Sequence, residues 1–267
     1  MKSYSVEAVV LRLRALGEAD RIVTLFSRER GKLSAVARGA RKVANKFGAR
    51  LDFFSRVSMM LHAGKSLDAI TSVQTVSSIW EALVDPDAFA AASYVAEVID
   101  ALCEPDFAVE EAYDALCAFQ RALARDVDRD ELLAAMDLHL LDALGVGPEL
   151  DACARCGAVL GRRPLKGGRA RLSPQSGGLV CDACAVALRS GGITEEAGTV
   201  LQVSARDFAR LRELRRTPLD ELGKESQATR LHRITQAFVE QQMGRRSRAL
   251  AVGAAGTRAK RTAGRRR

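Results

Sequence analysis

The sequence lacks the features that mark membrane proteins and exported proteins. Its 267 residues contain no run of 18 apolar positions, so no segment is expected to cross a bilayer as a helix. The N-terminus shows no charged segment followed by an apolar run, so we expect no signal peptide. These absences predict a cytoplasmic protein with no membrane partner.

Motifs of the common enzyme classes are also missing. The chain has three histidines, His62, His139 and His232, and the sequence suggests no catalytic partner for any of them. There is no glycine-rich phosphate loop ending in Lys-Ser or Lys-Thr, no His-Glu-x-x-His and no zinc-deaminase signature. We therefore expect no catalytic residue and no small-molecule substrate. An enzyme with an unfamiliar site stays open as an alternative.

Four of the six cysteines form two pairs with the spacing of zinc ligands, Cys153-x2-Cys156 and Cys181-x2-Cys184. Each pair can place two sulfurs on one tetrahedral Zn²⁺ at about 2.3 Å, and the 24 residues between the pairs can form a small β-ribbon. Four thiolates leave no position for water or substrate, so the spacing predicts one structural zinc ion. Redox-active pairs or disulfides are the alternative, which a reducing cytosol disfavours.

Charge is distributed along the chain in three blocks. Residues 1–80 carry 14 Lys and Arg against 6 Asp and Glu, residues 81–150 carry 3 against 17, and residues 151–267 carry 24 against 10. Basic ends suit a polyanion, and the acidic middle could bind a basic protein, neutralise a neighbouring domain or simply face solvent.

The first 80 residues read as a small β-domain. Leu11 and Leu13 alternate with Arg12 and Arg14, which is the period of a strand. Five strands are expected, at residues 5–14, 21–27, 32–38, 51–62 and 67–76. Five short strands of this size predict an OB-fold, a barrel that binds oligonucleotides.

Beyond residue 80 the apolar period becomes helical. Helices are expected from Pro86 to about Cys103, from Val109 to Arg125 and from Asp130 to Leu144, and again within residues 195–243. The fold class is therefore α+β and multidomain, an N-terminal OB-fold barrel with a C-terminal helical bundle that contains an inserted zinc ribbon. The expected segments are an OB domain at 1–80, helical parts at 81–150 and 191–243, a zinc module at 151–190 and a basic disordered tail at 244–267.

Basic residues of the first domain are the candidates for nucleic-acid binding. Five lie in one loop and its flanks and four lie on or beside neighbouring strands, namely Arg38, Arg41, Lys42, Lys46 and Arg50, and Arg12, Arg14, Arg21 and Arg56. If the barrel forms, several should converge on a groove that follows a phosphate backbone. Aromatic residues are only 5 % of the chain, which favours electrostatic contact over base stacking. A solvated basic face is the alternative.

Three stretches resemble the bacterial RecO recombination mediator family. They are the N-terminal run from Ala8 to Lys42, which includes Gly17-Glu18-Ala19-Asp20-Arg21-Ile22-Val23, the helix end Leu140-Leu141-x2-Leu144-Gly145, and Ser176-Gly177-Gly178-Leu179-Val180-Cys181. The basic tail at 244–267 departs from the family pattern.

The resemblance implies an OB domain, a helical domain and a zinc module whose metal is structural. It implies binding of single- and double-stranded DNA, annealing of complementary strands, and work in the RecF repair pathway on the nucleoid. The implied protein partners are RecR and the acidic C-terminal tail of the single-strand binding protein SSB. A zinc-ribbon nucleic-acid adaptor without annealing activity is the alternative.

Overall fold

The computed structural model describes residues 3–41, 47, 50–160, 168–190, 199–224 and 230–249. The chain divides into two compact units, one of Met1–Ala124 with the segment from Ser247 onward, and one of Arg125–Arg246. Among the described helices, none combines the length and the apolar content that a bilayer crossing requires.

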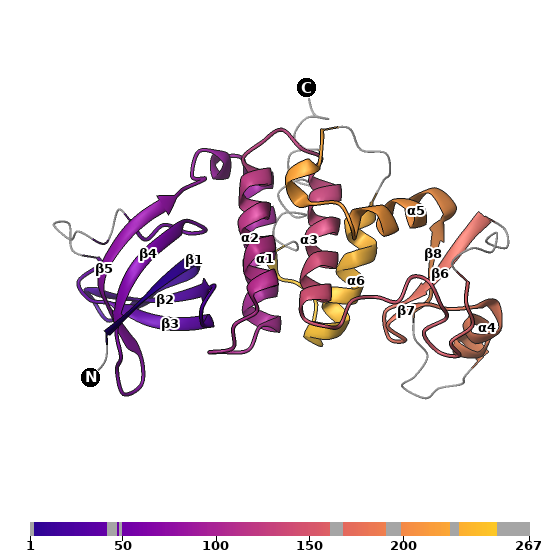
Figure 1. The fold of residues 1–267 in the computed structure, drawn as a ribbon, viewed down its shortest axis with the longest axis horizontal. Helices are drawn as coiled ribbons and strands as arrows, with labels where there is room; N and C mark the ends of the chain where they lie inside the picture. The colour runs from indigo at the N-terminus through magenta and orange to yellow at the C-terminus, as the bar shows by residue number, and fades with distance from the viewer. Residues whose placement is uncertain are drawn as a thin grey trace, which may run out of the picture. The chain divides into compact units, whose positions relative to one another are not determined.

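Five strands of the first unit close into a barrel in the order β1-β2-β3-β5-β4 (Figure 1). The strands are β1 (Ser3–Leu16), β2 (Asp20–Ser27), β3 (Gly31–Ala37), β4 (Arg56–His62) and β5 (Asp68–Ser77). Neighbouring strands are antiparallel except β3 and β5. The predicted five-stranded, OB-like barrel is confirmed. Its fourth strand begins at Arg56 and not at residue 51, because Phe54 adopts a left-handed backbone conformation with φ 60°.

A β-bulge in β1 changes which of its residues face the barrel interior. The pairing with β2 shifts between Val10 and Arg12, so Leu11 is an extra residue on β1. Val10 belongs to the interior cluster before the bulge, and Leu13 packs against that cluster after it. Because side chains alternate along a strand, Arg12 and Arg14 lie on the outer wall of the barrel.

Two helices of the first unit follow the barrel. They are α1 (Pro86–Leu102) and α2 (Glu110–Leu123), and the 3-10 turn η1 (Ala82–Val84) precedes them. Asp85 caps α1, because its carboxylate accepts a hydrogen bond from the backbone N–H of Asp87 at 3.1 Å. These bounds agree with the helices expected from the proline start and the helical period.

Helix α2 is attached to the barrel through buried contacts around Phe54. Nε2 of Gln120 donates to the backbone oxygen of Phe54 at 2.5 Å, and both residues are buried. The ring of Phe119 meets the Phe54 ring edge-on, with 6.1 Å between centroids. The hydroxyl of Tyr113 donates to the carboxylate of Glu7 on β1 at 3.1 Å. The unusual backbone of Phe54 thus presents both a ring and a carbonyl to α2.

The second unit contains the remaining long helices. They are α3 (Arg129–Ala143), α5 (Ala205–Leu214) and α6 (Leu231–Met243), with the 3-10 turn η3 (Leu219–Glu221) between the last two. Helices α3 and α6 lie side by side (Figure 1), and the hydroxyl of Thr235 donates to buried Asp137 at 2.7 Å. Arg210 of α5 forms an ion pair with Glu131 of α3 at 2.6 Å.

A three-stranded sheet with the order β7-β6-β8 completes the second unit. Its strands are β6 (Arg169–Ser173), β7 (Gly178–Leu179) and β8 (Leu201–Ser204), and α4 (Asp182–Ser190) follows β7. The prediction that Leu201 belongs to a helix is wrong, because β8 pairs with β6 through its backbone. Leu201 and Val203 alternate with polar residues, but four residues are too short for that period to compete with the helical pattern around them.

We expect Gln120→Met to lower the free energy of unfolding by about 1–3 kcal/mol, because the buried Phe54 carbonyl would lose its hydrogen-bond donor while side-chain volume is nearly kept. The change is measured as a shift of the urea midpoint. The same substitution at exposed Gln74 of β5 is the control and should leave the midpoint within error. An unchanged midpoint for Gln120→Met would contradict this account of the α2 contact.

Candidate metal centre and nucleic-acid surface

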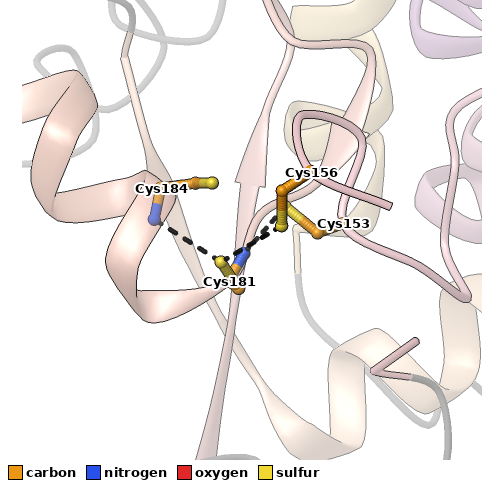
Figure 2. A group of neighbouring side chains, drawn as sticks. All are labelled: Cys153, Cys156, Cys181 and Cys184. Carbon is orange, nitrogen blue, oxygen red and sulfur yellow. Dashed lines mark hydrogen bonds between the residues drawn. The ribbon is translucent and has the colours of Figure 1, made fainter. Parts of the chain in front are cut away.

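The four paired cysteines converge in the second unit. Their sulfur atoms all lie within 4.8 Å of one another (Figure 2). Sγ of Cys156 is 3.8 Å from Sγ of Cys181. Tetrahedral coordination with metal–sulfur bonds of about 2.3 Å requires sulfur atoms about 3.8 Å apart. A disulfide would require about 2.05 Å, and all six cysteines are free thiols.

Local backbone structure brings the two pairs together. The first pair is closed by a turn in which Gly157 donates its N–H to the oxygen of Cys153 at 2.8 Å, with φ 73° at the glycine. Ala154, between the first two cysteines, donates its N–H to Leu179 of β7 at 2.8 Å. Because β7 leads directly into Cys181, this contact helps to set the first pair beside the second.

Backbone N–H groups point at the sulfurs. The N–H of Cys181 donates to Sγ of Cys153 at 3.3 Å, and the N–H of Cys184 donates to Sγ of Cys181 at 3.5 Å (Figure 2). Burial raises the pKa of the Cys153 thiol, but N–H groups of Cys181, Cys156 and Arg155 outweigh it and lower the pKa to about 6. The hydrogen bond with Cys181 and then burial raise the pKa of Cys184 to about 12. All four sulfurs could be thiolates this close together only with a cation to balance their charge.

The donor set and its surroundings therefore fit a metal ion. The apolar cluster around the cysteines is small, with Val180, Ala185 and Leu188 as its other buried members. A core of this size contributes little stability by itself, which is the situation in which proteins use a metal as a crosslink. All four positions of a tetrahedron would be filled by sulfur, so the centre can support folding and offers no place for a substrate.

Arg12 and Arg14, from the predicted nucleic-acid set, line a cleft of about 430 Å³ on the outer wall of the barrel. The other charged residues of the cleft come from the barrel, from the end of α1 and from the loop after it, and they are Arg30, Lys32, Asp68, Asp100 and Asp106. Counting the described residues, four cations thus face three carboxylates in this cleft.

Carboxylates of the acidic block neutralise most of these cations. Arg12 forms an ion pair with Asp100 near the C-terminal end of α1. Lys32 donates to the backbone oxygen of Asp100 at 2.5 Å and approaches its carboxylate at 3.8 Å. Arg30 pairs with Asp106 at 2.7 Å. No carboxylate among the described residues pairs with Arg14, which is exposed.

The pairing continues on α2. Arg28, on the turn between β2 and β3, contacts Glu110 at 3.0 Å and Asp114 at 2.6 Å. Part of the acidic middle block therefore neutralises barrel cations, which is one of the roles that its charge suggested. The local sequence pattern does not distinguish Arg28, Arg30 or Lys32 from the other basic residues, because the carboxylates of the acidic block that they meet lie 68 or more residues away along the chain.

The start of the predicted basic loop lies against the turn between β1 and β2. Gly39 donates its N–H to the Asp20 carboxylate at 2.7 Å, and the guanidinium of Arg41 donates to the oxygen of Gly17 at 2.9 Å. Arg38 and Arg41 are both exposed there. Arg14 and Arg38 lie on β1 and just after β3, two strands apart, so about 10 Å separates their strands. These exposed arginines gather at one end of the barrel.

The other predicted residues are more scattered. Arg21 is half-buried and pairs with Ala37 across β2 and β3, which puts it on the side of the interior cluster. Arg50 donates to the backbone oxygen of Val73 at 3.2 Å. Arg56 lies 3.5 Å from the Glu7 carboxylate. Lys42 and Lys46 lie outside the described residues.

We name Arg14, Arg38 and Arg41 the barrel-end arginines. Phe47, the aromatic residue nearest to them in the loop, packs against the barrel interior and does not stand out as a stacking platform. The surface at this end of the barrel can therefore attract an anionic backbone through charge, with little capacity to read bases.

Comparison with known proteins gives concordant results over both units. Residues 1–79 match the family model described as Recombination protein O N terminal, and residues 83–251 match Recombination protein O C terminal. The chain is 36 % identical over 185 residues to the DNA repair protein RecO of Symbiobacterium thermophilum, covering 69 % of this chain and 72 % of that one. It is 34 % identical over 221 residues to the RecO of a Roseiflexus species, with 83 % and 73 % covered. The RecO of a Nocardioides species is 32 % identical over 209 residues, with 77 % and 84 % covered.

Proposed function

Because this chain belongs to the RecO family of DNA repair proteins, we propose that it anneals complementary single strands of DNA. We further propose that it acts with RecR to help load recombinase on DNA coated by SSB, whose acidic tail it contacts. The barrel-end arginines are the observation that carries the DNA-binding part of this proposal. The proposed work needs no catalytic residue, and its place is the nucleoid in the cytoplasm.

The proposed DNA contact is electrostatic. Among the described residues, Arg14 has no carboxylate partner, and the Arg41 side chain donates to a backbone oxygen. Neither charge is neutralised by a carboxylate there, so both side chains are available to bind phosphates. Lys42 and Lys46 add two charges in the same loop by sequence. In this proposal Arg21 and Arg50 contribute at the edge of the surface. Arg12 and Arg56 contribute least, because Asp100 and Glu7 already face them.

Annealing follows from charge neutralisation. Two strands repel each other through their phosphates, and a protein that binds both lowers this repulsion while the bases remain free to pair. Base pairing then supplies sequence specificity and the free energy of the product. No nucleotide hydrolysis is needed, which agrees with the absence of a phosphate loop from the sequence.

We propose that the metal of the four-cysteine centre is one zinc ion with a structural role. Cys153, Cys156, Cys181 and Cys184 would hold it, and the bound ion would join the turn at Gly157 to the start of α4. The centre would thereby stabilise the residue 151–190 module and leave DNA binding to the barrel of residues 1–80.

We expect elemental analysis to find about one zinc per chain, because a closed four-sulfur site retains zinc through purification. Cys156→Ser should lower the zinc content to well below half and make the module sensitive to protease, since the ion contributes folding energy. Cys103→Ser, a change outside the centre, should leave the zinc content unchanged. Wild-type protein without zinc, or a Cys156→Ser variant that keeps it, would contradict the assignment.

The proposed function is tested by annealing two complementary fluorescent oligonucleotides without ATP, bare and coated with SSB, over a salt series. We expect wild-type protein to accelerate annealing of both substrates, and the acceleration to fall as salt rises. Arg14→Glu with Arg38→Glu should slow annealing about tenfold or more at moderate salt, because four units of charge change at the barrel end.

The matched control is Lys65→Glu with Arg216→Glu, which changes net charge equally at exposed sites elsewhere. It should anneal at nearly the wild-type rate. Binding without annealing would instead favour the zinc-ribbon adaptor. Equal loss in both double variants would mean that net charge matters and the barrel end does not.

A further inference from the structure

A second basic groove lies wholly within the second unit, between β8 and α6. It has a volume of about 1030 Å³. Among the described residues, its charged lining consists of four arginines and two acids, namely Arg230, Arg233, Arg245, Arg246, Asp207 and Glu240. The balance of these described residues is +2, in a unit that otherwise pairs many of its arginines with carboxylates.

Three of the arginines keep their charge available. Arg230, Arg233 and Arg246 are exposed, and no carboxylate within the described ranges pairs with them. By contrast, Arg212 and Arg215 on and after neighbouring α5 form ion pairs with Asp151 and Asp142. Cations that are left without counter-charges on one groove are available for an external anion.

The arginines occupy both ends of α6. Arg230 immediately precedes the helix and Arg233 lies in its first turn, and both line the groove. Arg245 and Arg246 follow its end at Met243. Thirteen helical residues span about 20 Å, which matches the axial length of about six phosphates of one stacked strand. A point-like ligand would meet only one of these clusters, whereas a linear polyanion can meet both.

Between the two pairs of arginines, the groove is lined by two apolar residues of α6 and by an edge strand. Ile234 and Ala237 of α6 line it, and no aromatic residue from the described part of the chain does. All four residues of β8 line it as well, and β8 is an edge strand of its sheet. Backbone N–H groups of an edge strand can donate to phosphate oxygens without regard to base sequence.

We propose that this groove binds the phosphate backbone of a second single strand of nucleic acid while the barrel end holds the first. The inference rests on the proposed annealing function and deepens it, since annealing requires two strands on one protein or on neighbouring copies. The acids of the groove, Asp207 and Glu240, keep its charge moderate, so the second strand is held more loosely than a strand on a fully basic surface. Loose holding lets the product duplex leave.

The test uses full-length protein carrying Arg233→Glu with Arg246→Glu, and a control carrying Arg206→Glu with Arg216→Glu. The control makes the same charge change at exposed positions of the same unit that do not line the groove. Circular dichroism and zinc content of both variants are compared with wild type, so that loss of folding is recognised. A fluorescent ten-residue oligothymidine then reports the number of strands bound per chain.

We expect wild-type protein and the control to bind two strands per chain, and the groove variant to bind one. The groove variant should also anneal complementary strands about tenfold more slowly, with little change in its affinity for the first strand. Two bound strands and normal annealing in the groove variant would overturn the proposal. One bound strand in wild-type protein would overturn it too.

Two further outcomes distinguish a second-strand site from failure of the proposed annealing function and from a binding site for a protein partner. If wild-type protein fails to anneal but binds two strands, and the groove variant binds one, the proposed function fails and the groove assignment stands. If a fluorescent glutamate-rich peptide binds wild type but not the groove variant, while both bind two strands of oligothymidine, the groove takes a protein partner and the nucleic-acid assignment is overturned.

Discussion

The β-bulge at Leu11 determines which wall of the barrel carries positive charge. Before the bulge, the even-numbered residues of β1 face the interior, and Val10 belongs to the interior cluster. If that alternation continued, Arg12 and Arg14 would point into an apolar interior, at a desolvation cost of several kcal/mol for each charge. One extra residue reverses the alternation and sets both arginines on the outer wall, where carboxylates and solvent can reach them. The DNA-binding surface proposed for this protein therefore depends on a local irregularity of one strand.

Carboxylates from the acidic block then decide which barrel cations remain available. Arg12, Arg28, Arg30 and Lys32 face acids of α1, α2 or the loop between them, and these ion pairs join the helices to the barrel. Arg14 at the barrel end has no carboxylate partner among the described residues. In the second unit the same division recurs, because Arg210 and Arg212 of α5 and Arg215 just after it pair with acids, whereas the arginines at the two ends of α6 face an open groove. Positive charge thus serves attachment in some places and is left exposed in others.

Much of the fold could be predicted from the sequence because its signals are local. Strand alternation, the proline at the start of α1 and the cysteine spacing each act over a few residues, and the barrel, the helices and the sulfur cluster agree with them. The start of β4 and the strand β8 were missed, since the left-handed Phe54 and the pairing of β8 with β6 depend on tertiary partners. The same limit applies to the prediction of DNA-binding residues. From the sequence, Arg12 and Arg14 are equal candidates for DNA binding, because only the folded chain brings Asp100 to Arg12.

The measurement that tests the account most directly compares Arg14→Gln with Arg12→Gln in the salt dependence of single-strand binding. Each lost phosphate contact reduces the slope of log affinity against log salt by about 0.7. The account predicts that Arg14→Gln lowers the slope by this amount, whereas Arg12→Gln leaves the slope unchanged and lowers stability, because Asp100 loses the nearer of its two cationic partners. An equal fall of the slope in both variants, or a fall in Arg12→Gln alone, would contradict the claim that intramolecular carboxylates select which arginines bind DNA.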